Sequence, residues 1–249
     1  VNDIDADYDY RYTENGGPYG ERVLELKLKQ STQITIYKYD AKTNAPLSGA
    51  EFAVYNGGNE YMLAGNPIKG TTDANGNLTL AVREGTFTLK ETKAPEGYAG
   101  LANDISFKVT TSGETLTVTS DSEYFKDSTF KVPNTPKTAE VKFLKTDGSS
   151  APLAGAAFEL YDVDPRLSEN ANTTPIFTKD SAETTGLIWE GTLQLGKPYY
   201  LKETSAPEGY MPMAEVITLR MVEGANGEVT VSADPQTDIV SWALKDSVY

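Results

Sequence analysis

The chain has 249 residues, with 36 Asp and Glu against 22 Lys and Arg, and it contains no His and no Cys. The missing His and Cys exclude His-assisted hydrolases, Cys/His zinc sites, haem with His or Cys ligands, iron–sulfur clusters and disulfides. The formal charge of −14 argues against nucleic acids and anionic membranes as partners, because both require a basic surface.

No apolar run reaches the roughly 18 residues of a membrane span, and no signal segment begins the chain. We therefore interpret the sequence as a mature fragment without membrane insertion. Residues 1–31 match no other part of the chain: 3–12 are rich in Asp and Tyr, and 23–30 alternate like one strand. This strand belongs either to an upstream domain or, as an extra strand, to the domain that follows.

From residue 32 onward, the order of segments repeats. The run ITIYKYDAKTNAPLSGAEFAVY begins at Ile34, and VKFLKTDGSSAPLAGAAFELYD begins at Val141. The run LKETKAPEGY ends at Tyr98, and LKETSAPEGY ends at Tyr210. The chain is therefore expected to contain two copies of one domain.

Each copy continues with short runs rich in Val, Ile, Thr and aromatic residues, bounded by turn residues: ISFKVT and ITLRMV, TLTVTS and EVTVSA, STFKVP and VSWALK. This pattern predicts an all-β fold in which each copy is a sandwich of antiparallel strands. The segment DANGN at 73–77 is interpreted as a hairpin turn rather than a calcium loop. A helical turn is expected only within 163–183. We place the domains at 32–136 and 137–249, joined by a proline-containing linker near Pro136.

Side chains in a strand alternate between faces, so residues two apart share a face. In each copy this alternation places a Lys, a Glu and an Asn or Asp on faces that are otherwise apolar: Lys38, Glu91 and Asn134, then Lys145, Glu203 and Asp246. In both copies, 43 residues separate the Glu from the last member.

A single Lys–Glu pair of this kind would be interpreted as a surface ion pair, worth about 0–1 kcal/mol. Three inward polar positions in both copies instead indicate a shared role. Burial favours the neutral forms of Lys and Glu, which are a nucleophile and a hydrogen-bond donor. We therefore predict that Lys38 attacks the Asn134 carbonyl and expels ammonia. Lys145 would attack Asp246 and expel water.

These motifs resemble those of the collagen-adhesin B-type (CnaB) domains of Gram-positive pilins and adhesins, the SpaA-like family. The resemblance rests on the KxD runs at 38–40 and 145–147, PLxGAxF, LKETxAPEGY and the terminal Asn or Asp. It implies tandem transthyretin-like or inverse-immunoglobulin β-sandwiches. It also implies intramolecular isopeptide bonds, Lys38–Asn134 and Lys145–Asp246, assisted by Glu91 and Glu203.

The resemblance further implies a location at the Gram-positive cell wall, with other pilin or cell-wall components as partners through sortase linkage. The sequence lacks a YPK-type pilin motif and an LPxTG signal. This favours the stalk of a minor pilin or adhesin over a backbone pilin. No cofactor or metal is expected, and a single-turnover reaction does not make the chain an enzyme.

Two other functions remain open from the sequence. Surface loops such as 56–70 or 163–183 would bind a host matrix protein or glycan if the chain is an adhesin module. Alternatively, Glu91 and Glu203 would act in a glycan hydrolase. That class is disfavoured, because it needs two carboxylates facing one open cleft and each copy supplies one beside a lysine.

Overall fold

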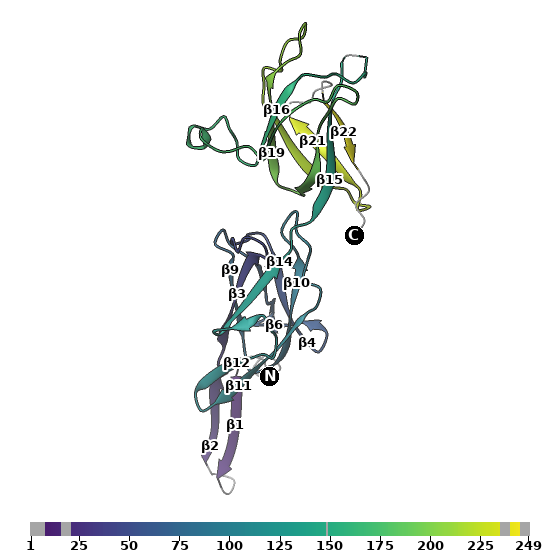
Figure 1. Ribbon diagram of the computed structural model, residues 1–249. Helices are drawn as coiled ribbons and strands as arrows, with labels where there is room; N and C mark the ends of the chain where they lie inside the picture. Colours follow the sequence, from purple (N-terminus) through teal and green to yellow (C-terminus); the bar gives the residue numbers. More distant parts are fainter. Residues whose placement is uncertain (1–7, 16–20, 148, 235–239, 245–249) are drawn as a thin grey trace. The chain divides into compact units, whose positions relative to one another are not determined.

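The computed structural model describes residues 8–15, 21–147, 149–234 and 240–244 (Figure 1). The chain divides into two compact units, here called unit 1 (Val1–Pro95 and Ala99–Thr135) and unit 2 (Glu96–Tyr98 and Pro136–Tyr249). Strands make up almost all of the regular structure, and the 3-10 turn η1 (Ser168–Asn170) falls within the segment expected to hold a helical turn. The predicted all-β class is confirmed. None of the described helical structure is long and apolar enough to cross a membrane.

Unit 1 is a sandwich of two sheets. The first has the order β12 (Thr115–Thr119), β11 (Ile105–Ser112), β10 (Gly85–Lys93), β4 (Glu51–Asn56) and β5 (Asn59–Glu60), and β8 (Lys69–Thr71) also pairs with β4. The second has the order β13 (Phe125–Lys126), β14 (Thr129–Asn134), β3 (Thr32–Asp40) and β9 (Asn77–Val82). A small hairpin joins β6 (Met62–Leu63) to β7 (Asn66–Pro67).

The core of unit 1 lies between these sheets and follows the alternation read from the sequence. Along β3, Ile34 and Ile36 are buried while the residues between them are only partly buried. Along β14, Phe130 and Val132 are buried in the same way. Each such side chain contributes roughly 1.5–3 kcal/mol when fully buried. The core therefore fixes which residues of each strand point inward.

One pairing departs from the antiparallel expectation. β14 runs parallel to β3, with Val132 opposite Lys38 and Asn134 opposite Asp40. Parallel neighbours need a long crossover connection, and here all the intervening strands of the unit provide it. The first and last strands of the sandwich therefore lie side by side with their ends aligned.

Unit 2 repeats this arrangement. One sheet has the order β17 (Phe177–Asp180), β16 (Ala157–Tyr161), β19 (Pro198–Ser205), β20 (Ile217–Glu223) and β21 (Val229–Asp234). The other has the order β18 (Leu187–Gln194), β15 (Thr138–Lys145) and β22 (Val240–Leu244). β22 runs antiparallel to β15, with Leu244 opposite Val141 and Val240 opposite Lys145. In direction it thus differs from β14, its counterpart in unit 1.

The segment before the first repeat forms a separate two-stranded sheet. β1 (Tyr8–Asn15) pairs antiparallel with β2 (Glu21–Leu28), from Tyr8 opposite Leu28 to Asn15 opposite Glu21. The sequence predicted one strand at 23–30, and its partner turns out to be the Tyr-rich segment before it. Among the described residues, β2 thus pairs with neither sheet of the first sandwich.

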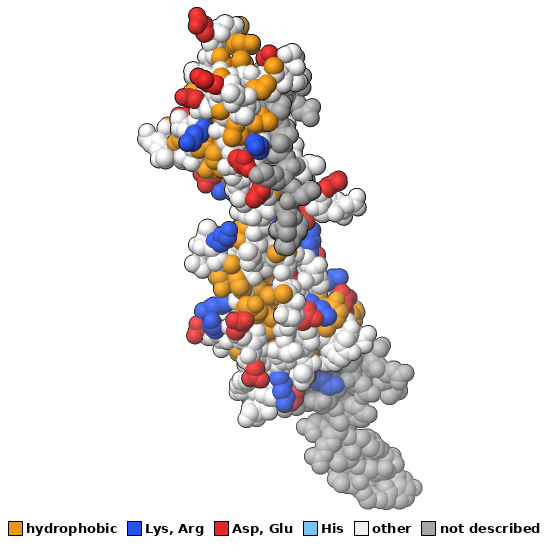
Figure 2. All heavy atoms as spheres, turned by 45° about the vertical axis from the view of Figure 1, so that its right-hand side comes forward, with side chains coloured by type: hydrophobic (Ala, Val, Ile, Leu, Met, Phe, Trp, Pro, Cys, Tyr) orange, Lys and Arg blue, Asp and Glu red, His pale blue; other side chains and the backbone are white. Residues whose placement is uncertain are grey.

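Apart from Asp40 and the two inward Lys–Glu pairs, the charged side chains of the described sandwich residues are at least partly exposed. On the face drawn in Figure 2, Lys and Arg side chains are interspersed with Asp and Glu rather than gathered into one patch. Exposed pairs such as Lys90–Asp104, at 2.8 Å, each contribute about 0–1 kcal/mol. The two Lys–Glu pairs inside the sandwiches are of a different kind.

A glycine turn fixes the backbone at the inward lysine in each unit. The Lys38 N–H donates to the Gly76 carbonyl at 2.7 Å, and the Lys145 N–H donates to that of Gly186 at the same distance. Both glycines have positive φ, and a Cβ atom at either would overlap the carbonyl oxygen of its lysine. Glycine is therefore required by close approach as well as by conformation.

We predict that Gly76→Ala lowers the free energy of unfolding of unit 1 by about 3 kcal/mol or more, because the new methyl group displaces the Lys38 backbone. The measurement is chemical denaturation. Gly113→Ala is the matched control, since Gly113 also has positive φ but nothing within 4 Å of an added Cβ. That control should lose only about 1–2 kcal/mol. Equal losses would show that backbone conformation alone explains the glycine.

Candidate functional site

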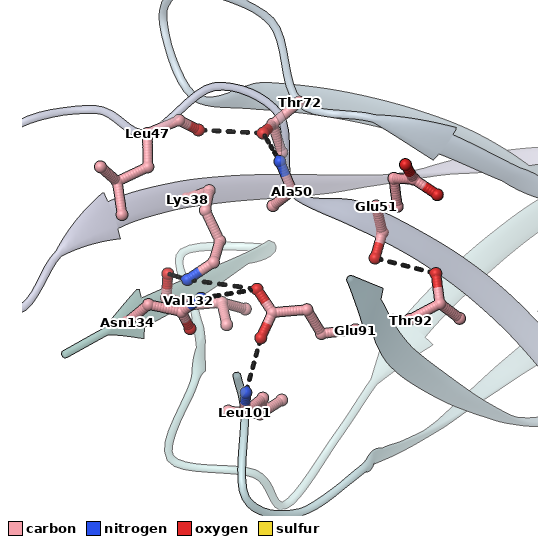
Figure 3. A network of polar contacts seen from close by, with 10 residues as sticks. All are labelled: Lys38, Leu47, Ala50, Glu51, Thr72, Glu91, Thr92, Leu101, Val132 and Asn134. Atoms are coloured by element: carbon pink, nitrogen blue, oxygen red, sulfur yellow. Dashed lines mark hydrogen bonds and ion pairs between the residues drawn. The ribbon is translucent and has the colours of Figure 1, made fainter. Parts of the chain in front are cut away.

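The first candidate residue, Lys38, lies near the end of β3 on its inward face and has no exposed surface. Besides the Gly76 contact, its carbonyl accepts the Leu47 N–H at 2.9 Å. Leu47 belongs to the PLSGAEF run, which the Thr72 hydroxyl holds by donating to the Leu47 carbonyl and accepting the Ala50 N–H (Figure 3). The PLxGAxF motif therefore clamps the lysine strand rather than contributing reactive groups.

Glu91 reaches the same space from β10, in the opposite sheet. Its side chain is fully buried. The pairing of β10 with β4 shifts just beyond it: Glu91 lies opposite Phe52, whereas Lys93 lies opposite Glu51. Thr92 is the extra residue of this bulge, and its hydroxyl donates to the Glu51 carbonyl at 3.2 Å. Bulges commonly redirect side chains next to functional sites.

Asn134 completes the set from the end of β14 and is 2 % exposed. Its Nδ2 donates to Glu91 Oε1 at 2.8 Å, and Glu91 Oε2 accepts the Leu101 N–H at 2.6 Å. Lys38 Nζ lies 3.7 Å from Glu91 Oε1 and donates to the Val132 carbonyl at 3.0 Å. Lys38, Glu91 and Asn134 thus point toward one another inside the sandwich (Figure 3).

Two features make this cluster chemically unusual. Asn134 Oδ1 is buried without a hydrogen-bond partner, which typically costs about 1–3 kcal/mol. Burial also lowers the pKa of Lys38 from 10.5 to about 8, although the attraction of the Glu91 carboxylate opposes the shift. Burial therefore increases the fraction of molecules in which the Lys38 amine is neutral at neutral pH.

Unit 2 reproduces the Lys–Glu half of this cluster. Lys145 Nζ lies 3.6 Å from Glu203 Oε1, and their side chains are 6 % and 0 % exposed. Glu203 Oε2 accepts the Met213 N–H at 2.7 Å, and Glu203 Oε1 is buried without a hydrogen-bond partner. The same bulge follows Glu203, and the Thr204 hydroxyl donates to the Ala157 carbonyl.

The predicted third member of this second set, Asp246, lies outside the described residues. The described strand before it, β22, passes Lys145 at Val240 and reaches Val141 at Leu244. For Asp246 to lie beside Lys145 as Asn134 lies beside Lys38, the last strand would have to run parallel to β15, as β14 runs parallel to β3.

The aspartates of the two KxD motifs do not join the clusters. Asp40 Oδ1 accepts the N–H groups of Lys42 and Thr43, and Asp147 Oδ1 accepts those of Ser149 and Ala151. Hydrogen bonds from the Ser149 hydroxyl and these amides hold the pKa of Asp147 below its usual value. Each aspartate thus stabilises the turn that follows the lysine strand.

Sequence reasoning missed the backbone groups that orient the glutamates. The Leu101 N–H binds Glu91, and the Met213 N–H binds Glu203. In both copies the donor lies ten residues after the glutamate, and this constant spacing is a signal that the sequence does contain. Sequence reasoning also missed the Val132 carbonyl, which accepts a hydrogen bond from Lys38 and is positioned by the parallel pairing of β14 with β3.

Comparison with known families identifies the family to which the two repeats belong. The family model described as SpaA, prealbumin-like fold domain, matches residues 32–124 and again 139–236. The chain belongs to this family. The prealbumin-like repeats coincide with the two sandwiches, which confirms the resemblance drawn from the sequence motifs. No protein of curated function matches the sequence.

Solved structures with similar chains include the Bacillus anthracis TIE protein, which is 21% identical, with 86% of this chain covering 38% of that one at a TM-score of 0.47. The Streptococcal ancillary pilin is 22% identical (82% of this chain, 62% of that one, TM-score 0.32). The pilus adhesin SpaC from Lactobacillus rhamnosus GG is 16% identical (92% and 30%, TM-score 0.45). The chain thus spans less than two thirds of each. Likeness at this level carries no argument about function.

The buried lysine of the first prealbumin-like domain makes its stability depend on pH when it is left as a free amine. We predict that Asn134→Ala, which leaves Lys38 free, becomes more stable between pH 8 and 10.5. The folded-state pKa, about 8, lies below the unfolded value of 10.5, so the cost of the buried charge is complete below pH 8 and disappears as pH rises. The gain in free energy of unfolding is roughly 3 kcal/mol at most.

The matched control for this titration is the double variant Asn134→Ala with Lys38→Met, which has the same small residue at 134 and no amine. Its stability should lack the rise between pH 8 and 10.5. If both variants rise equally, groups other than Lys38 cause the effect and the lowered pKa is wrong.

Proposed function

We propose that the chain is a stalk region of a Gram-positive cell-surface pilin, of the minor or ancillary kind, or of an adhesin. In this proposal, residues 32–136 and 137–249 are tandem domains, each closed by an autocatalytic isopeptide bond between its first and last strands. The observation that carries the proposal is the buried contact of Lys38 and Asn134 with one carboxylate, Glu91.

The reaction in the first domain begins with a proton transfer. Lys38 Nζ passes a proton to Glu91, 3.7 Å away, which leaves a neutral amine and a protonated carboxyl group in place of two buried charges. The amine then attacks Asn134 Cγ. The Nζ–Cγ bond forms, the Cγ–Nδ2 bond breaks, and the amine's proton leaves with Nδ2 as ammonia. Glu91 carries this proton from Nζ to Nδ2 and still holds the proton that it first took from Lys38. It returns to a carboxylate when the ammonia takes up that proton and leaves as ammonium.

The amide orientation supports this order of events. With Glu91 ionised, Asn134 Nδ2 donates to it and Oδ1 has no partner. After Glu91 takes the proton, a half-turn of the nearly symmetric amide brings Oδ1 to the carboxyl O–H. That hydrogen bond polarises Cγ toward attack. Because the fold holds the reacting groups together, proximity contributes about 7–11 kcal/mol toward such a step.

The bond would change how the domain carries tension. Chain tension enters at the start of β3 and leaves after Asn134 at the end of β14. A Lys38–Asn134 bond would carry it directly between these strands, so that residues 39–133 bear no load. The bond also closes a loop of 96 residues. In the chain-entropy treatment derived for disulfides, a loop of that length adds about 4.7 kcal/mol of stability.

For the second domain we propose the equivalent bond, Lys145 to Asp246, with Glu203 in the role of Glu91 and water as the leaving group. Support comes from the contact of Lys145 with Glu203 and from the shared separation of 43 residues between glutamate and acceptor. The proposal requires residue 246 to approach Lys145, a different path from the antiparallel course of β22.

The proposal places the chain outside the cell, at the wall of a Gram-positive bacterium. Its partners there would be other pilin or wall components joined by sortase linkage. It would act without a cofactor, and not as an enzyme, since each lysine reacts once.

Intact mass spectrometry tests the bonds. We predict that the purified chain is lighter than its sequence by one ammonia and one water. Glu91→Ala should restore only the ammonia, and Glu203→Ala only the water, so each variant serves as the control for the other. An unmodified mass excludes both bonds, and loss of ammonia alone excludes the second.

A tryptic digest locates each bond, because trypsin does not cleave after an acylated lysine. The first bond should yield a branched peptide that joins residues 30–42 to 132–137, and the second should join 143–166 to 246–249. Linear peptides ending at Lys38 or Lys145 would contradict the corresponding bond.

A second candidate function, ligand binding by surface loops, is favoured by exposed apolar side chains. Leu167 and Ile176, in the insertion of the second domain, are 47% and 45% exposed, and Met62 in the 56–70 segment is 50% exposed. Binding of the chain to immobilised matrix proteins or glycans, lost in Leu167→Ser with Ile176→Ser, would support this function. Binding that the double variant retains would exclude the insertion as the contact.

A further inference from the structure

The two-stranded sheet that precedes the first sandwich has one face composed of Tyr and Leu. β1 and β2 run antiparallel, and residues directly opposite each other in such a pair lie on the same face (Figure 1). The register brings three tyrosines opposite three leucines at alternate positions: Tyr8 and Leu28, Tyr10 and Leu26, Tyr12 and Leu24. We call this two-stranded sheet the ribbon, and the face that holds these six residues its aromatic face.

The opposite face of the ribbon is charged, and its charges are matched across the strands. Asp9 lies opposite Lys27, and Arg11 lies opposite Glu25. Such opposite-charge pairs stabilise an antiparallel pair of strands by roughly 0.2–1 kcal/mol each. Val23 also lies on this face, and it is 42% exposed. The charged face is therefore suited to water, and the aromatic face is the one that requires cover.

The ribbon needs a partner to be stable. Among the described residues, no other strand pairs with β1 or β2. A two-stranded hairpin by itself is only marginally stable in water, and it becomes stable when strands are added or its apolar face is packed. Pairing of a further strand at the edge of the ribbon would leave the aromatic face in water. Packing of that face against another apolar surface avoids this cost.

Charge and area favour a second ribbon as that surface. At the end of the aromatic face near the turn, Glu14 lies opposite Arg22, so the face carries no net charge in a chain of −14. Two such faces can meet without bringing an unpaired charge into the contact. Aromatic side chains bury about 150–250 Å² each, so the six tyrosines of two ribbons would bury about 900 Å² at the lower figure. The six leucines would raise this area above the roughly 1,000 Å² expected of a specific interface.

We propose that the aromatic face of the ribbon is an interface between two copies of this chain. The two ribbons would pack face to face about a two-fold axis, like the sheets of a small sandwich, with their charged faces outward. The area is close to the lower limit for specific interfaces, and the expected dissociation constant is therefore in the micromolar range.

This inference rests on the register of β1 and β2, and it depends neither on the isopeptide bonds nor on the stalk function. Association of the chain and its loss of mass are measured separately. Failure of one proposal therefore leaves the other untouched.

Sedimentation velocity at concentrations from about 1 to about 100 µM tests the association. We expect the mean mass to rise with concentration toward twice that of the monomer. The variant with Tyr10→Glu and Leu26→Lys should remain a monomer throughout, because it places charges within the aromatic face. These two residues are directly opposite each other, so the introduced carboxylate and amine form a pair that preserves the register.

The matched control introduces the same two side chains on the charged face, as Thr13→Glu with Val23→Lys, which are also directly opposite each other. Its association should equal that of the unchanged chain. If both double variants still dimerise, the contact lies elsewhere and the proposal is overturned. If both lose the dimer equally, association depends on the fold of the ribbon rather than on its aromatic face, which also overturns the proposal.

Hydrogen exchange of the unchanged chain covers the case in which the variants fold poorly. The amides of β1 and β2 should exchange more slowly at about 100 µM than at about 1 µM, whereas those of β3 should not change. A chain that stays monomeric at every concentration overturns the proposal. Protected ribbon amides in that monomer would indicate that the aromatic face packs within one chain, and unprotected amides would indicate a partner of another kind.

Discussion

An amine buried beside a carboxylate and a carboxamide constrains the rest of this molecule. A lone ammonium would be expelled from an apolar core, and a lone carboxylate equally so. Lys38 and Glu91 stay buried because they form an ion pair with each other. This ion pair requires that β3 and β10, which belong to opposite sheets, place the two side chains next to each other. The pKa of Lys38 is lowered because burial outweighs the attraction of Glu91.

The sequence motifs act mainly through the backbone. PLxGAxF supplies Leu47 and Ala50 to a clamp around the lysine strand, and the Thr of the KET run fastens the bulge beside the glutamate. The KxD aspartate stabilises the following turn. Most of the shared residues thus hold the side chains of Lys38, Glu91 and Asn134 in place, as the proposed reaction would require, since its rate would depend on geometry.

Much of the fold and half of the site could be predicted from the sequence, because alternation decides which face a residue occupies. It correctly placed Lys38, Glu91 and Asn134 inward, together with Lys145 and Glu203. The direction of a strand cannot be predicted in this way, because side chains alternate identically in parallel and antiparallel neighbours. The alternation of side chains therefore could not predict that β14 runs parallel to β3 or that β22 runs antiparallel to β15. The hydrogen bonds from the Leu101 and Met213 amides could not be predicted either. Every residue except proline carries a backbone N–H, and only the folded structure shows which of them reaches the glutamate.

The parallel pairing of β3 and β14 has a consequence for the segments that flank this sandwich. Strands that run side by side in the same direction bring the chain in at one end of the sandwich and release it at the other, roughly 30 Å away for the nine residues of β3. A segment joined before β3 or after β14 can therefore be exchanged without rerouting any strand of this sandwich.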